Sequence, residues 1–288
     1  MNTALGILFG LMSMLSYGLS NAISKVPAKK DGSQKLLFYR NVFISILLLL
    51  VFLLSNHENI FLDPQTIITT ILVSSLGAIP LIALYQSLKL GKVGVVTPIT
   101  GSSAIFTIIL ALIFFKETLN TIQVIAVFLI VLGNILISIN FKEIKKSHLF
   151  SYSSGVPLAV AGSLGLGAYF FLIKIPINTF GPILAALLVE TGVAIGAAVY
   201  ILATNRSFSL SDKSSMKYIF FVAILAGFGG LVYNYGVRVA PVSLVTAVGS
   251  ARPMVSIIYG KLVYKEKLQT KQYLAGLIIV SGLIIISL

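Results

Sequence analysis

Three ionisable side chains lie inside long apolar stretches of the sequence, where a charge is costly. Glu190 follows the segment PILAALLV, Arg252 lies within VGSARPM, and Arg40 follows LLFY. A charged residue at the centre of a membrane-spanning helix costs at least about 2.5–3.5 kcal/mol on insertion scales, so residues of this kind usually serve binding or transport. We therefore take these three residues as the first candidates for a binding site.

Glu190 and Arg252 have neighbours that suit a polar cavity. Small residues, among them Ala186 and Ala194, surround Glu190 at helical spacing, which allows a cavity wall or close packing. Pro253 follows Arg252 and removes one helix hydrogen bond, which frees a carbonyl beside the guanidinium. The guanidinium can bind a carboxylate or a phosphate through two parallel hydrogen bonds. Alternatively, Glu190 and Arg252 pair with each other and only lock two helices together.

The elements that must position these residues are membrane-spanning helices. The chain is 57% hydrophobic and 10% charged, whereas soluble domains have about 25% charged residues. Its apolar stretches have the length that a helix needs to cross a bilayer. We therefore predict an all-α integral membrane protein with ten spans, at residues 4–24, 36–54, 66–88, 93–115, 120–140, 154–174, 182–204, 217–238, 242–264 and 270–288.

The basic residues predict the orientation of these spans. Among the loops, Lys116, Lys174 and Arg238 lie on one face of the predicted topology, and all other loop Lys and Arg residues lie on the opposite face. Loops rich in Lys and Arg stay in the cytoplasm, so we expect a plasma-membrane protein with both termini outside. The net charge of +13 reflects this bias, and we expect no binding to nucleic acid.

The two halves of the chain repeat one pattern with a shift of 149 residues. Residues 93–139 align without a gap with residues 242–288 and are identical at 17 of 47 positions, including the pairs Lys116 and Lys265, Glu117 and Glu266, and Gly133 and Gly282. We therefore divide the chain into repeats 1–140 and 154–288. Because each repeat has five spans, the second enters the membrane from the opposite side, an arrangement typical of secondary transporters.

These features resemble the EamA-type transporters of the drug/metabolite transporter superfamily. The resemblance rests on the ten spans in two repeats, on the Lys-Glu-x-Leu link before the last span of each repeat, and on the segments LYQSLKLGKVGVVTPI and YNYGVRVAPVSLVTAVGSARP. It implies a substrate site in a central cavity and, most often, export of a small metabolite without ATP. Ala104 stands where the second repeat has Pro253, so the two fourth spans need not bend alike.

Arg40 and a set of neutral polar residues complete the predicted site. The resemblance implies a place for Arg40 at the cavity mouth, but it lies about one turn inside its span, and we favour a side chain that reaches the headgroups. The neutral residues lie on the first, third and eighth spans. Any one of them can simply join two helices, but as a set we predict that they line the cavity: Tyr17, Asn21, Tyr85, Gln86, Tyr233, Asn234 and Tyr235.

Other classes of function lack the residues that they require. The sequence has no G-x-x-x-x-G-K-[ST] loop for ATP, no cysteine, and two histidines, His57 and His148, in different loops. We therefore predict no catalytic set, no metal site and no cofactor, and we do not expect an enzyme. Glu117 and Glu266 each precede the last span of a repeat, where a carboxylate caps a helix N-terminus. We therefore interpret this motif as structural.

Together these patterns favour a secondary transporter that exports a small amphipathic or zwitterionic, amino-acid-like metabolite through an alternating-access cavity. A zwitterion explains both buried charges, because its carboxylate can bind Arg252 and its ammonium Glu190. The expected partners are the lipid bilayer, the small-molecule substrate and, through Glu190, protons. The alternatives are an uptake carrier for a sugar or phosphorylated metabolite, which Arg40 and Arg252 would suit, and a membrane scaffold or enzyme without transport.

Overall fold

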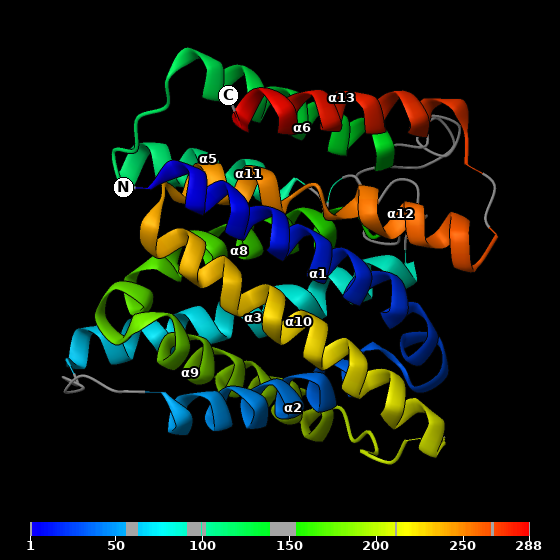
Figure 1. Ribbon diagram of the computed structural model, residues 1–288. Helices are drawn as coiled ribbons and strands as arrows, with labels where there is room; N and C mark the ends of the chain where they lie inside the picture. The colour runs from blue at the N-terminus through cyan, green and yellow to red at the C-terminus, as the bar shows by residue number, and fades with distance from the viewer. Residues whose placement is uncertain are drawn as a thin grey trace.

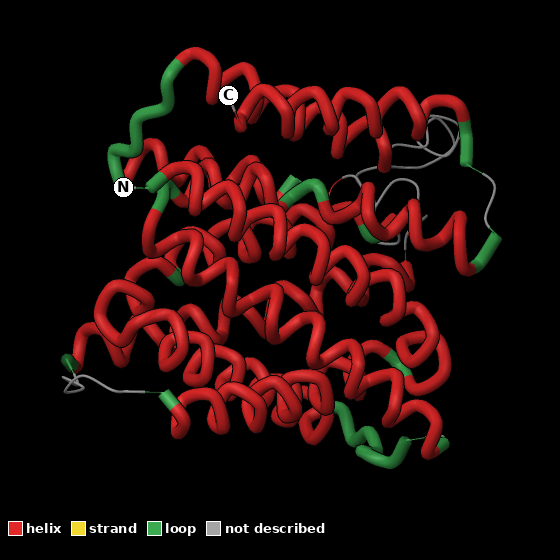
Figure 2. The backbone as a smooth tube through the Cα atoms, in the orientation of Figure 1, coloured by secondary structure: helices red, strands yellow, loops and turns green. Residues whose placement is uncertain are grey.

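The computed structural model describes residues 2–55, 63–90, 99, 102–138, 154–210, 212–265 and 268–287. All regular structure in these residues is helical (Figure 2). The first repeat contains α1 (Thr3–Asp31), α2 (Ser33–Leu54), α3 (Pro64–Leu90), α5 (Ser103–Phe114) and α6 (Thr121–Ser138). The second contains α8 (Val156–Leu172), α9 (Lys174–Ala203), α10 (Lys213–Val239), α11 (Val242–Gly249), α12 (Arg252–Val263) and α13 (Thr270–Ser287).

These helices correspond to the ten predicted spans, with α11 and α12 together forming the ninth. Within the described residues, 7 helical stretches are long and apolar enough to cross a membrane, and three shorter apolar helices cover residues 103–114, 121–137 and 156–172. The prediction of an all-α membrane protein with ten spans is therefore confirmed. The ninth span is interrupted between Gly249 and Arg252, next to Pro253, as expected for a residue that lacks the backbone N–H.

Two helices extend beyond their predicted ends. α1 continues to Asp31 rather than ending at residue 24, and includes Pro27. α9 begins at Lys174 rather than at residue 182, and a bend at Gly181, with φ of 77°, separates its first segment from the rest. Hydropathy marks only the apolar part of a helix, so polar or bent extensions at its ends escape prediction.

The two chain termini lie at the same end of the helices (Figure 1). The backbone N–H of Asn2 donates a hydrogen bond of 2.9 Å to the carbonyl of Val239, so the start of α1 lies beside the link between α10 and α11. Glu117 and Lys174 lie at this same end, which we call the N-terminal face. Both termini on one face agree with an even number of spans.

The last helices of the two repeats, α6 and α13, pack side by side at one edge of the molecule (Figure 1). Gly133 of α6 faces Ile279 of α13, and a Cβ added to this glycine would lie 2.5 Å from the Ile279 Cγ1. The repeat-related Gly282 faces Ile130, and its added Cβ would lie 2.8 Å from the Ile130 Cγ1. These reciprocal contacts relate the two repeats by a local two-fold axis.

Candidate substrate cavity

A small cavity lies among α1, α2, α8, α9 and α10. Its volume is about 10 Å³, which is room for about one water molecule. Four of the predicted site residues line it: Tyr17, Glu190, Tyr233 and Asn234. The remaining lining is aromatic or apolar apart from two glycines, and comes from Ile44, Leu48, Tyr169, Phe170, Ile173, Ala186, Val189, Gly227, Gly230 and Leu231.

Glu190 reaches the cavity from α9 opposite a glycine of α10. A Cβ added to Gly230 would lie 2.9 Å from the Tyr17 hydroxyl oxygen and 4.0 Å from the Glu190 Oε1, so the missing side chain leaves room for both polar groups. Within the described part of the chain, no hydrogen bond or ion pair joins the Glu190 carboxylate to another residue. The positive charge of Arg40 acts on it electrostatically. Glu190 is therefore a cavity carboxylate that accepts no hydrogen bond from the described residues.

Arg252 lies between two aromatic rings beside the same cavity. Its Cζ atom is 5.3 Å from the ring centroid of Tyr17 and 5.4 Å from that of Phe170, distances at which a guanidinium is attracted to the ring face. Gly18 permits this arrangement, because an added Cβ would lie 2.9 Å from the Arg252 carbonyl oxygen. Arg252 forms no ion pair with Glu190 among the described contacts. The two charges therefore flank Tyr17 separately in this conformation.

An aromatic layer connects the two charged groups. Phe170 packs edge-on against Tyr233 with centroids 5.3 Å apart, and against Tyr169 at 5.0 Å. The Tyr233 hydroxyl shares a 2.7 Å hydrogen bond with the Thr246 Oγ1, which joins α10 to α11. The cavity thus has an acid at one side, a guanidinium at another and aromatic faces between them.

Arg40 turns toward the protein interior, which differs from the expectation that its side chain reaches the headgroups. Its Nε donates a 2.9 Å hydrogen bond to the Oδ1 of Asn41, whose side chain is fully buried. Thr191, next to Glu190, donates a 3.1 Å hydrogen bond to Ser45 of the same helix as Arg40. The bond between Thr191 and Ser45 joins α9 to α2 near the cavity acid.

Three predicted lining residues lie elsewhere. Gln86 donates a 2.7 Å hydrogen bond to the Tyr200 hydroxyl, which joins α3 to α9. Tyr235 packs against Phe9 of α1 with centroids 5.9 Å apart, and Asn21 is exposed one turn beyond Tyr17. The side chain of Tyr85 lies outside the described part of the structure. Successive helical residues differ by about 100° in direction, so neighbours in sequence, such as residues 233 to 235, do not all face one cavity.

Sequence reasoning missed the two aromatic residues of α8, Tyr169 and Phe170. Aromatic side chains in an apolar span look like ordinary core or lipid-facing residues, which hides their role. One signal was available: with the shift of 149 residues, Phe170 aligns with Asn21 and Glu190 aligns with Asn41. Comparing polar positions across the repeat would have directed attention to this region of α8.

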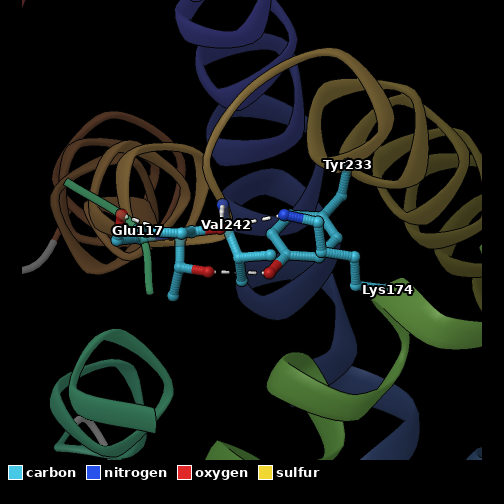
Figure 3. Close-up of polar contacts among 6 residues, drawn as sticks. Glu117, Lys174, Tyr233 and Val242 are labelled. Carbon is cyan, nitrogen blue, oxygen red and sulfur yellow. Dashed lines mark hydrogen bonds and ion pairs between the residues drawn. The ribbon is translucent and has the colours of Figure 1, made fainter. Parts of the chain in front are cut away.

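Glu117 belongs to the first repeat, but its side chain lies at the start of α11 in the second repeat (Figure 3). Its Oε1 accepts a 2.8 Å hydrogen bond from the Val242 backbone N–H, and its Oε2 accepts bonds of 3.0 and 2.7 Å from the N–H and hydroxyl of Ser243. Lys174 donates to Oε1 at 3.0 Å. The carboxylate therefore caps α11 and joins both repeats at the N-terminal face.

This placement corrects the expectation that Glu117 caps α6, the last span of its own repeat. Asn120 and Gln123 cap α6 instead, since each side-chain oxygen accepts the backbone N–H of the other residue, at 2.9 and 3.1 Å. Burial alone raises the pKa of the Glu117 carboxyl, but the hydrogen bonds from Ser243, Lys174 and Val242 outweigh it and hold the pKa below its usual value. Glu266, the matching residue, lies outside the described residues.

The model of the EamA-like transporter family matches residues 4–139 and 153–288. The chain belongs to the EamA-like transporter family. The two matches correspond to the five-span repeats. The family resemblance noted in the sequence is therefore confirmed, and this EamA-like transporter is a multi-pass membrane protein whose partners are the bilayer and a small-molecule substrate.

Two known proteins are similar to this EamA-like transporter, one in sequence and one in fold. The uncharacterized protein MJ1333.1 of Methanocaldococcus jannaschii is 33% identical over 141 residues, which cover 49% of this chain and 99% of that protein. The matched length is close to one EamA repeat. A solved crystal structure of a protein that is 14% identical covers 98% of each chain with a TM-score of 0.80, so the two proteins share the fold.

Proposed function

We propose that this EamA-like transporter exports a small zwitterionic, amino-acid-like metabolite across the plasma membrane. The observation that carries the proposal is the separation of Glu190 and Arg252. They have opposite charges, flank the same Tyr17 ring and form no ion pair with each other among the described contacts. A buried charge without a partner is costly, and a substrate with both charges offsets that cost at both residues.

The two charged side chains at the cavity suit the two ends of such a substrate. The guanidinium of Arg252 binds the carboxylate, because its planar donors match two carboxylate oxygens. The carboxylate of Glu190 binds the ammonium, and the faces of Tyr17, Phe170 and Tyr233 favour a cation between them. A cavity of about 10 Å³ is far too small for this substrate, so the helices must separate to admit it, as alternating access requires.

Glu190 is also the proposed site of proton exchange. A carboxylate that accepts no hydrogen bond from the described residues can hold either the substrate ammonium or a proton, and the two then compete for one position. The transporter family and this binding chemistry support a carrier rather than an enzyme. The proposed orientation, with both termini outside, rests on the distribution of Lys and Arg among the loops.

Transport in proteoliposomes tests the proposal. Glu190→Gln should abolish uptake of amino acids and related zwitterions, or reduce it at least about 100-fold, and should remove most of its pH dependence. Asp212→Asn is the matched control, since Asp212 is an exposed acid at the start of α10, and it should transport like the wild type. Normal transport with an unchanged pH profile in Glu190→Gln would refute the role of this residue. Transport of phosphorylated sugars in place of zwitterions would favour the alternative carrier.

A further inference from the structure

The Glu117 carboxylate joins three segments that are distant in the sequence. It belongs to the link between α5 and α6, and its partners are Lys174 at the start of α9 and residues 242–243 at the start of α11. Its side chain is 5% exposed and that of Lys174 is 17% exposed. One nearly buried carboxylate thus receives four hydrogen bonds and holds parts of both repeats together at the N-terminal face.

The backbone before Glu117 adopts a conformation that L-residues rarely take. Lys116 has a φ of 51°, in the left-handed region, which residues other than glycine rarely adopt because of their Cβ. Lys265, its counterpart in the second repeat, has a φ of 54°. Both Lys-Glu links therefore contain a lysine in the left-handed region, and in the first repeat the glutamate that follows it contacts α11 rather than α6.

α11 connects this carboxylate to the substrate cavity. All eight residues of α11 are buried. Glu117 binds its first residues, Thr246 in its middle is hydrogen-bonded to the cavity residue Tyr233, and Arg252 is the third residue after its end. A displacement of α11 at the N-terminal face would therefore reach both the aromatic layer and the guanidinium of the cavity.

We propose that Glu117 is a positioning residue for transport, whose carboxylate holds α11 closed across the N-terminal face, and that release of α11 opens the substrate cavity toward that face. The apolar side chains of α11 pack in the core through non-directional contacts, whereas the four directional hydrogen bonds of Glu117 must break together. Water can replace polar bonds near a membrane surface, so the closure is reversible. The proposal rests on the proposed function only in taking this cavity as the substrate site.

Labelling of a single cysteine tests the closure without knowledge of the substrate. The natural chain has no cysteine, so Leu231→Cys introduces one thiol at the cavity wall. The probe is a membrane-impermeant maleimide applied to intact cells or to oriented proteoliposomes. Asn178→Cys, exposed on the first segment of α9, identifies the N-terminal face. In the Glu117→Gln background, labelling of the cavity cysteine from that face should accelerate about tenfold, as expected for loss of a hydrogen-bonded charge.

Asp212→Asn is the matched control for this experiment. Asp212 also caps a helix, accepting a 2.9 Å hydrogen bond from the Ser214 N–H, and also pairs with a lysine, Lys30, at 2.7 Å. However, it lies at the opposite end of the helices, and the side chains of Lys30 and Asp212 are 40% and 48% exposed. Its substitution should leave the labelling rate of the cavity cysteine unchanged.

A second variant keeps the test decisive if Glu117→Gln fails to fold. Ser243→Ala removes the hydroxyl donor and leaves both backbone donors and Lys174, so labelling should accelerate about threefold, as for loss of one weaker hydrogen bond. Equal labelling rates in the wild type and in a folded variant, Glu117→Gln or Ser243→Ala, would overturn the proposal and leave Glu117 a structural cap. That result would not affect Glu190→Gln transport, so the two proposals fail separately.

Discussion

Substitution by alanine should have opposite effects on the stability of the protein at two glycines of α13. A Cβ added to Gly282 would lie 2.9 Å from the Ala126 carbonyl oxygen and 3.1 Å from the Ile130 nitrogen, both backbone atoms of α6. A Cβ added to Gly276 meets no described atom within 4 Å. We therefore expect Gly282→Ala to destabilise the protein and Gly276→Ala to stabilise it.

The magnitudes follow from these contacts. Alanine in place of an unobstructed helical glycine stabilises by about 0.5–1 kcal/mol, because it restricts the unfolded chain. At Gly282 the backbone of α6 must move away, and overpacking of this kind costs about 1–3 kcal/mol. After the gain from alanine in a helix is subtracted from this cost, Gly282→Ala should lower the free energy of unfolding by about 0.5–2 kcal/mol. The two variants should then differ by roughly 1–3 kcal/mol in the free energy of unfolding.

Heating in detergent, followed by size-exclusion chromatography, measures this difference as the temperature at which half of the protein remains monodisperse. Gly276→Ala should shift this temperature upward by a small amount, and Gly282→Ala should lower it by several degrees. Gly133→Ala, the repeat-related change, should behave like Gly282→Ala, since its Cβ would lie 3.0 Å from the Ala275 carbonyl oxygen. If Gly282→Ala proved as stable as Gly276→Ala, the close approach of α6 and α13 would be wrong.

Two further predictions concern the N-terminal face. A reporter that is active only outside the cytoplasm should be active when fused after Leu288 and silent when fused near Lys145, and the reverse pattern would contradict the orientation. Because hydrogen bonds lower the pKa of Glu117 relative to the unfolded value of about 4.3, the stability that they add is present above that value and is lost as the pH falls through the folded pKa. The difference in thermal stability between wild type and Glu117→Gln should therefore stay constant from neutral pH to about pH 5 and shrink at lower pH; a difference that grows on acidification would contradict the network.

The span pattern was predictable because the bilayer fixes the length and hydrophobicity of each helix. The repeat was predictable because charged and amide residues such as Lys116, Glu117 and Gln123 recur at one spacing, which apolar coincidence does not explain. The early start of α9 was not predictable, since its first segment is too short and too polar to span a membrane. Its bend at Gly181 depends on a positive φ that sequence alone does not reveal.

The candidate site was predictable only in part. Tyr17, Glu190 and Tyr233 carry polar groups in apolar helices, and burial of such groups demands an interior position. Gln86 met the same criterion, but its hydrogen bond to Tyr200 uses the amide to join two helices. Whether a polar residue lines the cavity or joins two helices depends on the rotation of its helix about the helix axis. That rotation is set by packing against helices distant in the sequence.

The partner of Glu117 shows the same limit more clearly. A carboxylate just before a helix suggests a local cap of that helix. The actual partners, Lys174 and Ser243, are 57 and 126 residues away. Only the three-dimensional arrangement of the two repeats brings them to one carboxylate.

The contacts that cross between the repeats also determine the order in which the molecule can be completed during synthesis. The bond from Asn2 to Val239, the bonds from Glu117 to α11, and the packing of α6 on α13 each join an early segment to one made much later. The first repeat therefore enters the bilayer before the later segments that these contacts require. Until the ninth and tenth spans are inserted, the Glu117 carboxylate does not yet have α11 to cap, and Gly133 does not yet have Ile279 beside it. The nascent first repeat is thus incomplete on its own, and these contacts form only when the part of the chain from Val239 onward has been made.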